Sequence, residues 1–188
     1  IEQYVTFPVN AGFQDRTAEG ILQTLIEVGK TTVDEPENYD ARANLVWCST
    51  MALNGLIGAG VPQDWATHML GHEITAITGL DHAKTLAVIQ IANWKIRRTR
   101  KKEKLVQYAQ RVWDIHEGDD DQRIDTAIEK TENFFNSIGM ATRLSDYNIG
   151  ADIVDKVIAA LEKHGMTKLS EHQDVTLDVS RQILEKAL

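Results

Sequence analysis

Three of the six histidines of this chain lie within fifteen positions of one another, at His68, His72 and His82. His68 and His72 are four residues apart in a segment with helical periodicity, so both side chains should lie on one face of a helix. That spacing allows two imidazoles to approach one metal ion. The turn Gly79-Leu80-Asp81 could then fold His82 back onto the same face. The pattern predicts a metal site or a catalytic site built from imidazoles.

The histidine pattern leaves its carboxylate partner open, and a second interpretation stands beside it. Glu73 follows the second histidine and not the first, so the segment is not a metalloprotease motif. Candidates for an added carboxylate are Asp64, Asp15 and Asp81. An imidazole in an apolar helix is also often a hydrogen-bonded core residue, because burial without a polar partner is costly. The remaining histidines adjoin polar residues and predicted helix ends and are interpreted as structural or solvated: His116, His164 and His172.

Helical periodicity dominates the sequence that must position these residues. Apolar residues recur at three- and four-residue spacing, and no segment alternates with a period of two. Gly29, Gly139 and Gly165 stand where helix-ending glycines are common, and Asp64 is a plausible N-cap. We therefore predict an all-α, non-repeating multi-helix bundle. The expected helices cover residues 14–29, 39–56, 64–77, 80–94, 104–114, 121–137, 150–164 and 176–188.

Composition and charge exclude several classes of protein. The chain has 188 residues, of which 43% are hydrophobic and 26% charged, and this argues against intrinsic disorder. One cysteine excludes an intramolecular disulfide framework, and Cys48 is expected to be a buried, reduced thiol. No apolar run is long enough to span a membrane and no secretory leader is recognised, so we expect no membrane partner and a cytoplasmic location.

The segment from Lys95 to Lys104 holds seven basic residues and one acidic residue, although the net charge of the chain is −8. No aromatic residues interleave with these bases as a nucleic-acid platform would require. We interpret the segment as a solvated helix end and expect no nucleic-acid partner. The glycine-rich segment from Gly55 to Gly60 follows a helix and lacks dinucleotide-loop spacing, so it is interpreted as an interhelical connection. The four tryptophans are expected in the core or in an interface.

Two segments, residues 60–73 and 79–83, carry a resemblance to a known family, and residues 39–44, 52–55, 144–147 and 176–179 agree with it. The chain resembles the C-terminal helical domain of iron-containing alcohol dehydrogenases, nearest to the NADP-dependent butanol dehydrogenase and aldehyde reductase branch. The resemblance implies that residues 1–188 form one metal-binding helical domain, like the α-domain of dehydroquinate synthase. In this family that domain follows an N-terminal α/β domain that binds NAD(P).

The same resemblance implies roles for the histidines. His68 and His82 match metal ligands, and the metal is Fe2+ or Zn2+. His72 matches a histidine beside the nicotinamide and the substrate, so it is expected to be catalytic and not a ligand. The implied reaction interconverts primary alcohols and aldehydes by hydride transfer with NADP, while the metal polarises the substrate oxygen. The implied partner is a small-molecule alcohol or aldehyde. We also expect a homodimer, because the cleft face around His68 would be exposed as an apolar patch without the partner domain.

The sequence also departs from the family pattern. The family's Asp-x-x-x-His ligand pair precedes a Glu-Gln-Tyr segment, and here the sequence opens on Ile1-Glu2-Gln3-Tyr4. We therefore expect these residues to supply two of four ligands, to lack the nucleotide-binding domain and to be inactive alone. Ile91 stands where the family usually has proline. The alternative function is an independent all-α interaction or metal-binding module with structural histidines.

Overall fold

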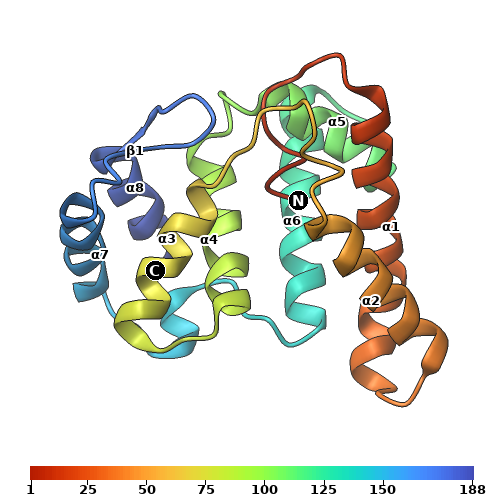
Figure 1. The fold of residues 1–188 in the computed structure, drawn as a ribbon, viewed down its shortest axis with the longest axis horizontal. Helices are drawn as coiled ribbons and strands as arrows, with labels where there is room; N and C mark the ends of the chain where they lie inside the picture. The colour runs from red at the N-terminus through yellow and green to blue at the C-terminus, as the bar shows by residue number, and fades with distance from the viewer. The chain divides into compact units, whose positions relative to one another are not determined.

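The computed structural model describes residues 1–188 and consists almost entirely of helices (Figure 1). The all-α prediction is confirmed, and no helix has the length and apolar character needed to cross a membrane. The elements are α1 (Gly12–Asp34), α2 (Tyr39–Leu53), α3 (Ala66–Thr78), α4 (His82–Ile96), α5 (Lys102–Val112), α6 (Asp120–Ser137), the 3-10 helix η1 (Leu144–Tyr147), α7 (Asp152–Lys163), β1 (Lys168–Leu169), β2 (Val175–Thr176) and α8 (Leu177–Ala187).

The chain divides into two compact units, which are described separately. Unit 1 comprises residues 1, 3–62 and 101–138, and unit 2 comprises residues 2, 63–100 and 139–188. In unit 1, α1 packs against α2 and α5, and α5 packs against α6. The core of unit 1 includes Tyr4, Leu105, Tyr108 and Ile124. Cys48 of α2 is buried and free, as predicted, and burial raises the pKa of its thiol.

Helix α1 is longer than the sequence analysis predicts, because Gly29 does not end it. A methyl group at Gly29 would meet Cζ of Phe134 at 2.7 Å, so this glycine allows the aromatic ring to approach the helix backbone closely. The helix instead ends at Asp34, just before the segment that contains Pro36. The prediction was wrong because a glycine required for close packing and a helix-ending glycine have the same sequence signature.

The two glycines inside α1 should respond in opposite ways to alanine. A methyl group added at Gly20 would meet no other atom within 4 Å, so Gly20→Ala should raise the free energy of unfolding by about 0.5–1 kcal/mol through helix propensity. Gly29→Ala gains the same propensity, but it must displace the Phe134 ring, and overpacking costs about 1–3 kcal/mol. Urea unfolding of the two variants checks this difference. Equal stabilisation of both would contradict the packing role of Gly29.

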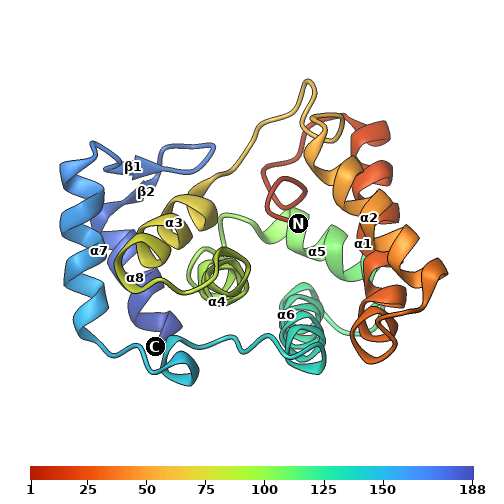
Figure 2. The same ribbon diagram turned by 60° about the horizontal axis from the view of Figure 1, so that its bottom comes forward.

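Unit 2 is built from α3, α4, α7 and α8, with a short hairpin between α7 and α8 (Figure 2). Helix α3 packs against α4 and α7, and α8 packs against α4 and α7. The shared core includes Leu70, Val88, Val157 and Ile183. Strands β1 and β2 pair antiparallel with Lys168 opposite Thr176, and the sequence analysis missed them. Strands of two residues are too short to show alternation.

Helix starts follow local capping chemistry. Asp119 and Gln122 form a capping box at α6, and the Thr176 side chain caps α8. The prediction that Asp64 is the N-cap of α3 was wrong, because Trp65 occupies that position. Asp64 nevertheless accepts a hydrogen bond from the Ala66 amide at 2.8 Å, so its carboxylate still satisfies an amide in the first turn.

The basic segment is partly buried. Within unit 2, Arg97 is buried beside acidic side chains that are described below. Within unit 1, Lys101 donates a hydrogen bond to the Val5 carbonyl at 2.6 Å, and Lys104 pairs with Asp15 at 2.7 Å. These three cations therefore hold the fold together, which differs from the solvated helix end that the sequence predicts.

Candidate functional site

Three histidines come together where α3 turns into α4. His68 and His72 lie one turn apart on α3, and His82 is the first residue of α4. Gly79 ends α3 in the left-handed conformation, with φ of 75°, which lets the chain reverse. The ring centroid of His68 lies 6.2 Å from that of His72 and 5.5 Å from that of His82. The His72 and His82 rings stack at 4.3 Å, so all three imidazoles form one cluster.

The ring of His68 is held by a carboxylate. Its Nδ1 pairs with one oxygen of Glu2, and the other oxygen accepts a hydrogen bond from the Thr67 amide at 2.6 Å. An ionised carboxylate only accepts hydrogen bonds, so in the neutral ring Nδ1 carries the proton and Nε2 keeps its lone pair. Trp65 packs edge-on against the same ring with centroids 5.1 Å apart. The orientation of the His68 ring is therefore fixed, and its Nε2 is available to bind a metal ion.

His82 contributes a second nitrogen donor to the cluster. Its Nδ1 atom is buried and has no hydrogen-bond partner. Burial lowers the pKa of His82 below its usual value, and the neighbouring His72 and His68 lower it further. The neutral imidazole favoured there is the form that binds metals. His72 is exposed, so its ring faces solvent while it stacks on His82.

None of the three carboxylates considered from the sequence joins the histidine cluster. Asp64 is fully buried and pairs with Arg97 at 3.1 Å. Asp15 belongs to unit 1, where it pairs with Lys104. Asp81 is exposed and pairs with the lysine three residues later. The carboxylate that does contact the cluster is Glu2, which the sequence analysis did not single out for this role.

The sequence did not predict the contact between Glu2 and His68, because helical and turn spacing relates only residues that are close together in the chain. The residue stands 66 positions before His68, so no helical or turn pattern connects the two. The only signal was its place in the Glu2-Gln3-Tyr4 segment, which marks the family but does not say what the carboxylate contacts.

The donor atoms of the cluster fit part of a metal site. No group of three or more histidine, cysteine, aspartate or glutamate side chains in the structure could hold a metal ion. The cluster offers two neutral imidazoles, His68 through its free Nε2 and His82 with its unpartnered buried nitrogen. Imidazole suits iron and zinc alike, and a metal ion would give the His82 nitrogen the partner it lacks. These two residues fit an imidazole contribution to a metal centre that needs further ligands.

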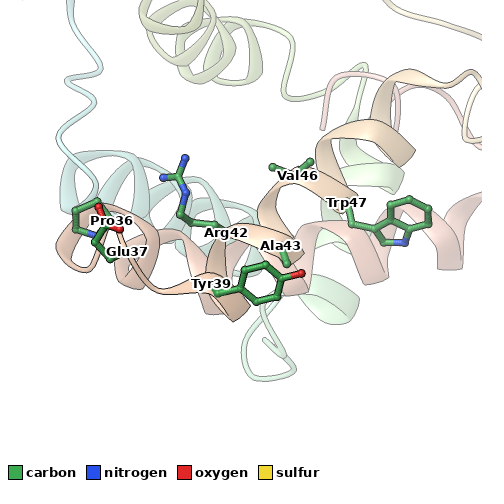
Figure 3. A pocket seen from close by; sticks show the side chains of 7 residues that line it. All are labelled: Pro36, Glu37, Tyr39, Arg42, Ala43, Val46 and Trp47. Atoms are coloured by element: carbon green, nitrogen blue, oxygen red, sulfur yellow. The ribbon is translucent and has the colours of Figure 1, made fainter.

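Other histidines and pockets do not compete with this cluster. His164 pairs with buried Glu73 at 2.7 Å, and His116 pairs with Asp114 at 2.8 Å. A pocket of about 790 Å³ in unit 1 contains no histidine (Figure 3). Its side chains come from α2 and the loop before it: Pro36, Glu37, Tyr39, Arg42, Ala43, Val46 and Trp47. Trp47 is 64% exposed, so it is not a core residue, whereas Trp94 is fully buried.

Comparisons with known proteins place the chain in a family. The model of the Fe-containing alcohol dehydrogenase family, C-terminal, matches residues 1–188. The chain is 61% identical over 187 residues to the NADPH-dependent aldehyde reductase YqhD of Escherichia coli, covering 100% of this chain and 48% of that protein. It is 36% identical over 154 residues to the NADH-dependent butanol dehydrogenase A of Clostridium acetobutylicum, covering 80% of this chain and 39% of that protein.

A comparison with solved structures supports the same family assignment. The substrate- and cofactor-free aldehyde reductase YqhD from E. coli superposes with a TM-score of 0.98 at 60% identity, over 100% of this chain and 49% of that one. The chain thus spans about half the length of this relative. The match covers every residue of the chain, including the histidine cluster and Glu2. The chain belongs to the Fe-containing alcohol dehydrogenase family and corresponds to its C-terminal region.

Proposed function

We propose that the whole protein is a metal-dependent, NADPH-linked oxidoreductase that interconverts primary alcohols and aldehydes. The observation that carries this proposal is the cluster of three imidazoles in which Glu2 orients His68 and leaves its Nε2 free. The 61% identity to an NADPH-dependent aldehyde reductase supports NADPH and an aldehyde as the reactants. Residues 1–188 are proposed to be inactive alone, since the two imidazoles do not complete a metal site.

Two of the histidines are proposed to hold the metal ion. His68 would bind through Nε2, and His82 would bind through the neutral imidazole that its surroundings favour. When bound, Fe2+ or Zn2+ would supply Lewis-acid polarisation of the substrate oxygen, and NADPH would supply the hydride. The buried Glu2 carboxylate and the edge of Trp65 keep the His68 ring in one orientation.

His72 is proposed to act on the substrate side of the cluster. Its ring stacks on His82 with an angle of 7° between the ring planes, and the residue is exposed, so a substrate or water can reach it. An imidazole in that position can orient a substrate hydroxyl or transfer a proton to it. This role needs no metal bond to His72, which agrees with the assignment that the family resemblance implies.

Replacing His72 with alanine should separate this role from metal binding. In the whole protein we expect His72→Ala to lower kcat about 100-fold, the range for loss of general acid–base assistance. The metal content should stay unchanged because the proposed ligands remain. Metal analysis and steady-state kinetics check both statements, with the exposed His172→Ala as control. A kcat equal to that of the unsubstituted enzyme would remove His72 from the reaction.

The proposed function is tested on the whole protein by metal analysis and by NADPH oxidation with a series of aldehydes. The expected result is about one Fe2+ or Zn2+ per chain, aldehyde-dependent oxidation of NADPH, loss of turnover on chelation and recovery on adding metal back. Aldehyde reduction that persists after complete removal of the metal would contradict the metal role. Absence of NADPH oxidation by the metal-loaded protein with every aldehyde would contradict the reaction.

A homodimer and a cytoplasmic location are also proposed for the whole protein. Exposed apolar side chains on α2, among them Val46, Trp47 and Leu53, are compatible with association of the whole protein. Sedimentation equilibrium of the whole protein tests the dimer, and a monomer at micromolar concentration would contradict it.

A further inference from the structure

We propose that Glu2 is a positioning residue that sets the tautomer and orientation of His68, so that Nε2 is the atom presented to the metal. This inference rests on the proposed function. Glu2 is only 4% exposed, and its two carboxylate oxygens bond to consecutive residues of α3. One oxygen accepts from the Thr67 amide at 2.6 Å, and the other pairs with Nδ1 of His68.

The first of these bonds places Glu2 at the start of α3. The N-cap residue of α3, Trp65, gives no side-chain hydrogen bond, and the first amides of a helix have no acceptor within the helix. Glu2 supplies an acceptor to one of these amides, and its negative charge is favoured at the positive end of the helix. The carboxylate is therefore anchored to the backbone of the element that carries His68.

Buried neighbours on α3 and α4 hold this anchor in place. Thr67 is 1% exposed, and its hydroxyl accepts a hydrogen bond from the Asn93 amide group at 3.1 Å. Asn93 is fully buried on α4, so α4 is tied to the residue that binds Glu2. A carboxylate fixed in this way has little freedom to release His68 or to accept from it at another angle.

The second bond determines which nitrogen of His68 is available. The carboxylate can only accept, so in the neutral imidazole, which is the form that binds metals, Nδ1 carries the hydrogen and Nε2 is bare. A histidine that ligates a metal commonly donates its other N–H to a carboxylate in this manner.

Glu2→Gln distinguishes positioning from a purely structural cap. The amide oxygen of glutamine can still accept from the Thr67 amide, which keeps the helix cap. Its NH2 group then faces His68 and can only donate, so it favours a bare Nδ1 and a protonated Nε2. If the side chain turns over, the NH2 group meets the Thr67 N–H, and two donors face each other. The substitution therefore preserves shape while opposing the tautomer that the metal requires.

The experiment uses the whole protein after removal of its metal and titrates it with Zn2+ alone, in competition with a chromophoric chelator. We expect Glu2→Gln to weaken Zn2+ binding about 10- to 100-fold. His82→Ala, which removes a proposed ligand, should weaken it further, and the exposed Glu27→Gln should leave it unchanged. Wild-type affinity in Glu2→Gln together with weakened binding in His82→Ala would overturn the role of Glu2 and leave the proposed function standing. Wild-type affinity in both variants would overturn the metal site itself.

A second measurement does not depend on the variant folding well. Long-range 1H–15N correlation spectra of the unsubstituted, metal-free protein report directly which nitrogen of each histidine carries hydrogen. At a pH where the His68 ring is neutral, we expect it to be protonated at Nδ1 and bare at Nε2. A His68 ring protonated at Nε2 would overturn the inference whatever the titration gives.

Discussion

Replacing His82 with alanine in the whole protein is expected to weaken metal binding at least about 100-fold and to lower NADPH-dependent aldehyde reduction about 1,000-fold. The proposed donor set in these residues contains only two imidazoles, so His82→Ala removes half of it. Lewis-acid stabilisation of several kcal/mol corresponds to a rate factor of about this size. Metal content after gel filtration and steady-state kinetics measure the two losses.

The control for His82→Ala is another histidine in a matched substitution. His116 is exposed and pairs only with exposed Asp114, so His116→Ala should keep both metal and turnover. The His82 variant should also remain folded, because the side chain has no hydrogen-bonded partner at Nδ1 to lose. Full metal content with unchanged kcat in His82→Ala would show that this cluster is not the metal centre.

Arg97→Met should be the most destabilising single substitution discussed for unit 2, with a loss of about 3–5 kcal/mol in the free energy of unfolding. The guanidinium is buried and lies 3.1 Å from Asp64, 2.7 Å from Asp174 and 3.7 Å from Glu171. Methionine keeps much of the volume but removes the positive charge from beside these carboxylates. Breaking a buried pair from one side is costly because the desolvated charge that remains loses its compensation.

Arg100→Met is the matched control for Arg97→Met. The Arg100 side chain is 67% exposed and pairs with Asp174 at 3.2 Å, so its loss should cost less than about 1 kcal/mol. Urea unfolding at neutral pH compares the two variants. Similar small losses for both would contradict the structural role assigned to the buried guanidinium.

The pH dependence of stability gives an independent check on the Arg97 cluster. Burial alone would raise the pKa of Asp174, but Ser170, Arg97 and Arg100 outweigh it and the pKa is lowered. A lowered pKa means that Asp174 stabilises the folded state above its unfolded pKa and that this contribution is lost as pH falls through the folded pKa. The gap in stability between the unsubstituted protein and Arg97→Met should therefore narrow on acidification.

Much of the fold could be predicted because the apolar periodicity of a helix is carried by residues that are close together in the sequence. The periodic apolar spacing located all eight α-helices, and the helix expected over residues 121–137 is observed as α6, Asp120–Ser137. The predictions were wrong where the surroundings of a residue are determined by a partner that is far away in the sequence. Gly29 faces Phe134 from another helix, and Arg97 and Lys104 find buried acids that no local pattern reveals.

Part of the candidate site could also be predicted from the sequence. Spacing brought His68, His72 and His82 together, and the structure places their rings in one cluster. Spacing also suggested Asp64 as a partner four residues before His68, but Asp64 lies ahead of the helix start and its carboxylate is turned to Arg97. The carboxylate that does contact His68 comes from Glu2, far outside any local window.

The bond between Glu2 and α3 has a consequence for the order of folding. Glu2 and Thr67 are separated by 65 positions, so synthesis delivers the carboxylate long before its partners. Joining the two closes a long loop, whose entropic cost must be met by the packing of the helices between and around them. A nascent chain therefore carries histidines with unconstrained tautomers and little affinity for metal. High-affinity metal capture should be one of the last events in maturation, following the collapse of the core.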